Sequence, residues 1–219
     1  KPLRMVTIDE PQPSGKMQRK LIWYMVYRVK NNGQHWKPAP KQDEFGHTTY
    51  GVEKVDDTQV RFFPHFVLEA VELQNKQYLD RVIPAALEPI KNREFPNQKI
   101  ELLDSVTISS KDIQVSDERT DRSVWGVVCW EDVDPRIDYL SVYIQGLTNA
   151  YRFEDKPNGF KKGDPPGTGR VLTQKTLQLN FWRPGDTVDE TEEEVRFGVR
   201  IESDPESQQK IFDLYGLRE

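Results

Sequence analysis

Residues 21–30, LIWYMVYRVK, decide the fold class of this chain. Successive side chains of a β-strand point to opposite faces of a sheet. Ile22 and Tyr24 therefore lie on one face, and Trp23 and Met25 lie on the other. Both faces are apolar, which is typical of a strand in the middle of its sheet, and the sequence predicts a central strand here.

Several other stretches have a β-rich or alternating pattern, which is typical of half-buried strands. They are residues 4–9, 60–72, 100–109, 123–130, 139–145, 172–182 and 195–201. The turn residues Asp132 to Pro135 favour a hairpin between the fourth and fifth of them. Residues 78–90 are compatible with a helix, but Pro84 and Pro89 oppose a long regular one.

About eight or nine strands at irregular spacing predict an all-β fold, an antiparallel immunoglobulin-like or jelly-roll-like β-sandwich over residues 1–202. The chain then changes period. Ser203 and Pro205 are typical of a helix start, and Gly216 of a helix end. The sequence therefore predicts a short C-terminal helix over residues 203–216, packed on the sandwich.

Residues 34–58 are mostly polar and are interpreted either as a long loop or as a loose pair of short strands. Trp36, Phe45 and Tyr50 stand in this stretch where no strand pattern requires them. Loop aromatics on a sandwich form binding platforms for peptides or sugars, so these three are the predicted ligand-binding residues. The alternative is a loop that folds back and buries them as a small satellite core.

The formal net charge of −5 disfavours nonspecific binding to nucleic acid, which needs excess Lys and Arg. The charge is unevenly placed: residues 1–42 hold nine Lys or Arg against two acids, a balance of +7. Residues 186–206 hold nine acids against two Arg, a balance of −7. These segments are interpreted as faces that attract each other within one fold, or between two copies or partners.

Two further features bear on the environment of the chain. Cys129 is the only cysteine and stands in an apolar run, which predicts a buried free thiol and allows no internal disulfide. No stretch approaches the roughly 18–20 apolar residues that span a bilayer, so no transmembrane segment is expected.

None of the possible catalytic or ligand-binding motifs is complete. Residues 164–170, DPPGTGR, resemble the phosphate-binding loop of AAA-type ATPases. That loop, however, needs Lys where Arg170 stands and Ser or Thr where Val171 stands, so a turn is predicted and no nucleotide is expected. A divalent metal at His35 and His47, with neighbouring Asp43 and Glu44, competes with the interpretation of ordinary loop histidines.

Calcium at Asp132 and Asp134, or at the acidic run 190–194, competes in the same way with a hairpin turn and a solvated segment. The sequence contains no Gly-x-Ser-x-Gly motif and no histidine that its surroundings identify as a catalytic base, so no Ser-His-Asp triad is predicted. The sequence therefore predicts no catalytic residue, no metal and no cofactor.

Residues 24–33, YMVYRVKNNG, resemble a strand-and-turn signature of bacterial immunoglobulin-like domains. The resemblance covers about a tenth of the chain and implies an extracytoplasmic β-sandwich, periplasmic, envelope-associated or secreted, with an adhesive, scaffolding or stalk role. No ligand-contacting residue follows from it.

These observations favour a non-catalytic binding or structural protein of the bacterial cell envelope or exterior, which acts through a protein partner or as a homo-oligomer. A carbohydrate-binding β-sandwich module that uses Trp36 or Tyr50 is the first alternative. A hydrolase with unrecognised acidic catalytic residues is the second.

Overall fold

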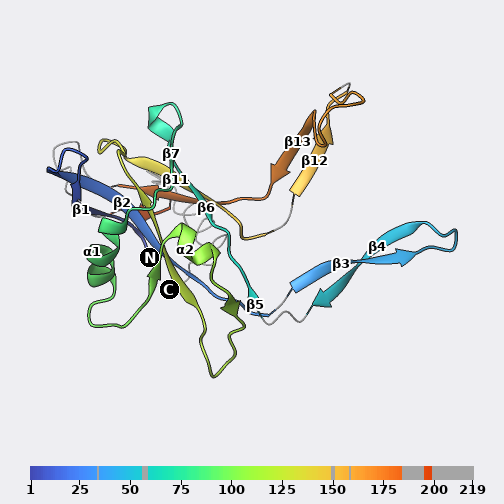
Figure 1. Cartoon of the computed structure of the whole chain (residues 1–219), viewed down its shortest axis with the longest axis horizontal. Helices are drawn as coiled ribbons and strands as arrows, with labels where there is room; N and C mark the ends of the chain where they lie inside the picture. The colour runs from blue at the N-terminus through green and yellow to red at the C-terminus, as the bar shows by residue number, and fades with distance from the viewer. Residues whose placement is uncertain (34, 56–58, 149–150, 158, 184–194, 199–219) are drawn as a thin grey trace, which may run out of the picture.

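The computed structural model of the chain describes residues 1–33, 35–55, 59–148, 151–157, 159–183 and 195–198. Two sheets and two helices form the main part of its body, and two hairpins project from the same side of that body (Figure 1). The described part is mostly β-structure in several antiparallel sheets, so the predicted all-β class is confirmed. The predicted helix over residues 203–216 lies outside the described residues.

The first sheet is built around the strand that residues 21–30 predicted. Its order is β1-β2-β10-β8, with β1 at Leu3–Pro11, β2 at Met17–Val29, β10 at Val124–Trp130 and β8 at Leu102–Leu103. β2 pairs antiparallel with β1 on one side and with β10 on the other. Its side chains at Ile22, Trp23 and Tyr24 are fully buried, so the predicted central position is confirmed.

The second sheet is antiparallel throughout. Its order is β15-β14-β11-β6-β7, with β15 at Arg196–Phe197, β14 at Leu177–Trp182, β11 at Tyr139–Gln145, β6 at His65–Ala70 and β7 at Lys76–Leu79. A 3-10 turn, η1 at Val71–Leu73, leads from β6 towards β7.

One hydrophobic cluster joins the two sheets. Trp23 and Trp130 contribute from the first sheet, and Phe66, Leu140 and Phe181 from the second. Burial of large apolar side chains contributes roughly 1.5–3 kcal/mol each, so this cluster is the main stabilising feature of the body.

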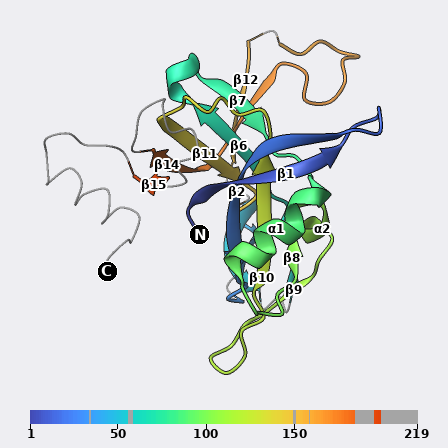
Figure 2. The ribbon, with the colours of Figure 1, turned by 90° about the vertical axis from the view of Figure 1, so that its left-hand side faces the viewer.

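Helix α1 (Pro84–Glu94) covers the opposite face of the first sheet, where it lies across β2 and β10 (Figure 2). Ala86 and Ile90 are fully buried there in a second cluster with residues of β2. The prolines did not prevent an eleven-residue helix. Pro84 stands in the first turn, where its missing N–H has no intrahelical partner to lose. Pro89 is on the exposed side of the helix.

The strand predicted at residues 100–109 is wrong beyond residue 103. Residues Ser105–Ser109 form helix α2 instead. The Asp104 carboxylate accepts hydrogen bonds from the backbone N–H groups of Val106, at 2.9 Å, and Thr107, at 2.7 Å. An aspartate cap of this kind starts a helix in a sequence that otherwise has the composition of a strand.

The hairpin predicted between residues 123–130 and 139–145 is also wrong. Both strands exist, but β10 belongs to the first sheet and β11 to the second. The connection between them buries Val133 and Ile137 in the cluster that joins the sheets. Because these two side chains pack between the sheets, the chain crosses from the first sheet to the second and β11 does not pair with β10.

Two other predicted strands are divided. The stretch 60–72 contributes Val60 to β5 (Gln59–Val60), which pairs with β9 (Ile113–Gln114), and β6 begins after Pro64. The stretch 172–182 is split between β13 (Arg170–Gln174) and β14. Of the last predicted strand, β15 is present and residues 199–201 lie outside the described residues.

A buried carboxylate holds the end of α1 against the first sheet. Glu94 accepts hydrogen bonds from the Tyr24 hydroxyl, at 2.7 Å, and from the Arg4 guanidinium, at 3.0 Å, and its Oε2 lies 3.2 Å from the Lys1 ammonium nitrogen. Burial alone would raise the pKa of Glu94, but the hydrogen bonds from Tyr24 and Lys1 and the charge of Arg4 outweigh it, and the pKa is lowered.

We expect Glu94→Gln to lower the free energy of unfolding by about 2 kcal/mol at neutral pH, because a charged hydrogen-bond acceptor is lost. A lowered folded-state pKa stabilises the fold above the unfolded pKa of roughly 4.3, and this stabilisation disappears as the pH falls further. Urea unfolding at neutral and acidic pH checks this, and the two proteins should converge in acid. A difference that stays constant with pH would contradict the role of the charge.

Candidate functional site

Residues 34–58, predicted either as a loop or as a loose pair of strands, contain a regular hairpin, which we call arm 1. β3 (His35–Gln42) and β4 (Thr48–Val55) are eight residues each and pair along their whole length. The Asp43 N–H donates to the His47 carbonyl over 2.9 Å, and Gly46, with φ 80°, occupies the left-handed position of the turn. The long-loop alternative is therefore wrong, and the paired-strand alternative holds.

Arm 1 has one apolar face. Residues opposite each other in a ladder share a face, and here Pro38 pairs with Val52 and Pro40 with Tyr50. Trp36 lies on the same face, two residues before Pro38. Trp36, Tyr50 and Val52 are 68%, 71% and 70% exposed, so the face is open to solvent.

The structure places two of the three predicted ligand-binding residues on this one face, Trp36 opposite Lys54 and Tyr50 opposite Pro40. Phe45 lies apart from them, in the turn at the tip of the arm, and is 83% exposed. The satellite-core alternative is wrong, because all three side chains are exposed. Sequence reasoning missed Pro38, Pro40 and Val52 as members of the same face. The period-two spacing of Trp36, Pro38 and Pro40 was the available signal, and the prolines concealed it.

A second hairpin, arm 2, is formed by β12 (Tyr151–Asp155) and β13 (Arg170–Gln174). Phe153 pairs with Leu172, and Tyr151 lies on the same face two residues away. These side chains are 51%, 66% and 65% exposed in that order. The Arg170 guanidinium stacks on the Phe153 ring at 4.1 Å from its centroid. Arm 2 therefore also presents an apolar face, which the sequence analysis did not identify.

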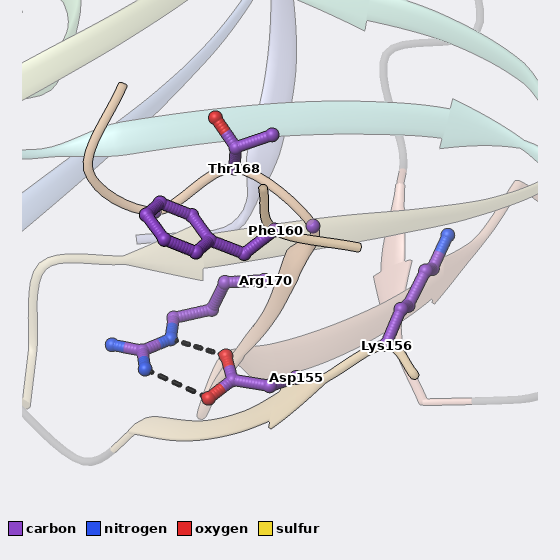
Figure 3. Close-up of a pocket in the computed structure, with 7 residues that line it drawn as sticks. Asp155, Lys156, Phe160, Thr168 and Arg170 are labelled. Atoms are coloured by element: carbon purple, nitrogen blue, oxygen red, sulfur yellow. Dashed lines mark hydrogen bonds and ion pairs between the residues drawn. The ribbon is translucent and has the colours of Figure 1, made fainter. Parts of the chain in front are cut away.

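The tip of arm 2 lines an open pocket of about 320 Å³ (Figure 3). Arg170 donates two hydrogen bonds to the Asp155 carboxylate, at 2.7 and 2.9 Å, and this lowers the pKa of Asp155. Phe160 and Thr168 line the same pocket. The charged pair is satisfied internally, so neither group is available as an acid or base without breaking it.

Residues 164–170 form turns that run into strand β13, as the sequence predicted. The Thr168 N–H donates to the Pro165 carbonyl over 3.2 Å, and the Arg170 N–H donates to the Gly167 carbonyl over 3.1 Å. The phosphate-binding loop that the sequence resembles requires a following helix, whose N-terminus faces the anion. Here a strand takes that place.

The described residues considered for metal binding are not gathered into a site, and the acidic run 190–194 lies outside the described residues. His35 begins β3, whereas His47 lies at the opposite end of arm 1 beside Asp43, with 3.3 Å between Nδ1 and the carboxylate. The Asp134 carboxylate is held by Arg136 at 2.7 and 2.9 Å, which lowers its pKa. Within the described residues no group of three or more His, Cys, Asp or Glu side chains is placed to hold a metal ion.

The predicted buried thiol is confirmed. Cys129 is 2% exposed, and burial raises its pKa to about 12. The charge of the Asp80 carboxylate, which accepts a hydrogen bond from Ser105, also raises the pKa of Cys129. A thiol with such a pKa stays protonated and unreactive at neutral pH.

Several cations of residues 1–42 have partners within the body. Arg4 pairs with Glu94, and Lys20 pairs with Glu10 at 2.7 Å and Glu131 at 3.2 Å. Two of these carboxylates, Glu94 and Glu131, lie elsewhere in the body and the third, Glu10, lies in the basic segment itself, so all three are outside residues 186–206. Most of that acidic segment falls outside the described residues, so the predicted attraction between the two segments stays a prediction.

Neither helix of the described chain has the length and apolar composition needed to cross a bilayer. No protein-family model, no curated protein and no solved structure matches this chain.

Proposed function

We propose that this chain is a non-catalytic structural protein that associates with copies of itself through its two arms. The observation that carries the proposal is the pair of exposed apolar faces on hairpins that project from the same side of the body (Figure 1). Contiguous apolar patches of more than a few hundred Å² are rare on monomeric soluble proteins and mark interaction surfaces.

The area offered by the arms matches that of a protein interface. Eight large apolar side chains on the arms and their tips are more than half exposed: Trp36, Phe45, Tyr50, Val52, Tyr151, Phe153, Phe160 and Leu172. With on the order of 100 Å² available from each, they offer about 800 Å² per copy, which is what one partner contributes to an interface of standard size.

Isolated hairpins also need a partner for their own stability. Arm 1 and arm 2 are two-stranded sheets without a third strand among the described residues. Such a hairpin is only marginally stable in water, and packing against another element stabilises it. Association would therefore stabilise the arms as well as bury their apolar faces.

The finer fold and the location belong to the same proposal. Two sheets that share one cluster support a β-sandwich of immunoglobulin-like or jelly-roll-like type. The proposed location in the cell envelope or outside the cell rests on the resemblance of residues 24–33 to bacterial immunoglobulin-like domains. The scaffolding role which that resemblance implies requires assembly, as proposed here. Fractionation of the source cells tests it, and recovery in the cytoplasm alone would contradict it.

The proposed self-association is tested by the solution mass of the chain at rising concentration, measured by light scattering. We expect the mass to rise to a multiple of the chain mass. A constant monomer mass would contradict the proposal. The same series at high salt separates the apolar arms from the attraction between residues 1–42 and 186–206, because salt screens only charges.

Carbohydrate binding is the second candidate, because Trp36 and Tyr50 share one exposed face. Aromatic rings that are open to solvent on a flat face provide stacking surfaces for sugar rings. A glycan array with the wild type and Trp36→Ala tests this function. Binding that Trp36→Ala abolishes supports it, and no binding, or binding that the variant leaves unchanged, removes it.

A further inference from the structure

We propose that the outer edge of β4 pairs with the same edge of a second copy, about a twofold axis at Gly51. The product is a four-stranded sheet, β3-β4-β4-β3, that closes as a dimer. This inference rests on the proposed function, since it specifies how the arms of two copies meet.

The register of arm 1 determines which backbone groups face outward. The hydrogen bond from Asp43 N–H to the His47 carbonyl belongs to the same ladder as the pairs Lys41–Thr49 and Ala39–Gly51. In an antiparallel ladder, pairs that exchange hydrogen bonds alternate with pairs whose N–H and C=O groups point away from the partner. The groups of β3 residues 36, 38, 40 and 42 and of β4 residues 48, 50 and 52 therefore point outward.

Proline blocks one of the two outer edges. Pro38 and Pro40 stand at outward-pointing positions of β3, where neither supplies an N–H. Prolines on an edge strand prevent another strand from pairing there. The outer edge of β4 keeps its donors at Thr48, Tyr50 and Val52, and β4 pairs with β3 alone among the described strands.

A second copy of β4 fits this edge in antiparallel orientation. With the twofold axis at Gly51, Tyr50 of each copy lies opposite Val52 of the other, and both residues expose hydrogen-bonding groups towards the partner. Aromatic and β-branched side chains in opposed positions are favourable cross-strand pairs, of roughly 0.2–1 kcal/mol each. Glu53 lies opposite Thr49, so like charges do not face each other.

The same geometry limits the assembly to two copies. Once the β4 edges are paired, the outer strands of the composite sheet are both β3, and both carry Pro38 and Pro40 on the open side. A twofold, isologous contact uses the same surface of each copy and closes. The apolar faces of arm 1 in the two copies then form one continuous surface, which carries Trp36 and Tyr50 from each copy. Arm 2 of either copy can pack against this surface.

A disulfide across the twofold axis tests the pairing. Gly51 would form a non-hydrogen-bonded pair with its counterpart, with Cα atoms about 4.5 Å apart, within the range for a disulfide of roughly 4.4–6.8 Å. A Cβ atom at Gly51 would meet the end of the flexible Lys41 side chain, at 2.9 Å from its Cε, which can move aside. The only native thiol, Cys129, is buried and unreactive, so we expect no covalent dimer from the protein without the added cysteine.

Ala39→Cys is the matched control, because Ala39 lies directly opposite Gly51 in the same hairpin. In the proposed dimer its Cα atoms are separated by three strand spacings, about 14 Å, which no disulfide spans. After mild oxidation we expect Gly51→Cys to run as a covalent dimer on a non-reducing gel and Ala39→Cys to remain a monomer. Equal cross-linking of the two variants, or none at Gly51→Cys, would overturn the edge pairing.

Val52→Pro provides a second test that keeps the β3–β4 ladder, because the Val52 N–H points outward. We expect at least a tenfold weaker association than for the wild type, and unchanged association would overturn the edge pairing.

The proposed function fails separately, if the wild type is a monomer at all concentrations. If the wild type associates and Trp36→Ser weakens it, but Gly51→Cys does not cross-link, only the β4 pairing fails.

Discussion

Replacing both Trp36 and Tyr50 by Ser is expected to weaken self-association by at least about 100-fold, which corresponds to roughly 2.7 kcal/mol. Interface energy concentrates in a few large aromatic side chains, and each costs about 2 kcal/mol or more when truncated at the centre of a contact. Because both side chains are about 70% exposed in the single chain, the stability of the body should change by less than about 0.5 kcal/mol. Sedimentation velocity over a concentration series measures the first quantity, and urea unfolding the second.

Lys37→Ser is the matched control for this experiment. Lys37 lies on β3 next to Trp36 but on the opposite face of arm 1, where it pairs with Glu53. Its replacement removes a long exposed side chain without touching the apolar face. Equal association of the wild type and the double variant would contradict the role of this face, and an equal loss in Lys37→Ser would contradict its assignment to one side of the hairpin.

Trp23→Ala is expected to lower the free energy of unfolding by about 3–5 kcal/mol, the usual cost of removing a fully buried Trp from a core. Trp23 is 0% exposed, stands beside Trp130 in the ladder between β2 and β10, and packs in the cluster that joins the two sheets. Its loss removes the transfer free energy of the ring and leaves a cavity between the sheets. Urea unfolding of the wild type and the variant measures the difference.

The same substitution at an exposed position separates burial from the chemistry of the side chain. Trp36→Ala should change the free energy of unfolding by less than about 0.5 kcal/mol, since Trp36 is 68% exposed. A loss of less than about 1 kcal/mol for Trp23→Ala would show that the two sheets do not depend on this cluster.

The sequence predicted those parts of the fold in which local pattern and tertiary position agree. Residues 21–30 are apolar on both faces, and β2 is buried on both faces between two neighbours. Cys129 stands in an apolar run and is buried in the layer between the first sheet and α1. In both cases the pattern depends directly on burial, so it identifies the buried position.

Other parts of the fold depend on capping and tertiary contacts that a local sequence pattern does not reveal. Residues 105–109 have the composition of a strand, but the capping hydrogen bonds of Asp104 start a helix. The strands β10 and β11 were predicted correctly, whereas their pairing depends on whether Val133 and Ile137 enter the core between the sheets. Sequence spacing alone does not decide that.

The sequence identified individual residues of the candidate site, but it did not predict that they share one apolar face. Trp36 and Tyr50 were identified because aromatic side chains are unusual in a polar stretch. Their common face depends on the register of β3 with β4, which the turn at Asp43 and Gly46 sets. The exposure of that face depends on the absence of a covering layer within the described chain, and an alternating apolar pattern is the same for a covered and an uncovered strand.

The most direct test of self-association through the arms is the solution mass of the wild type, measured by light scattering at low and high salt over a range of concentrations. The account predicts a dimer that high salt leaves intact or strengthens, because the burial of apolar surface is not screened and excluded salts favour it. A monomer at every concentration would contradict the account, and a dimer that dissociates in high salt would move the interface from the arms to the charged segments.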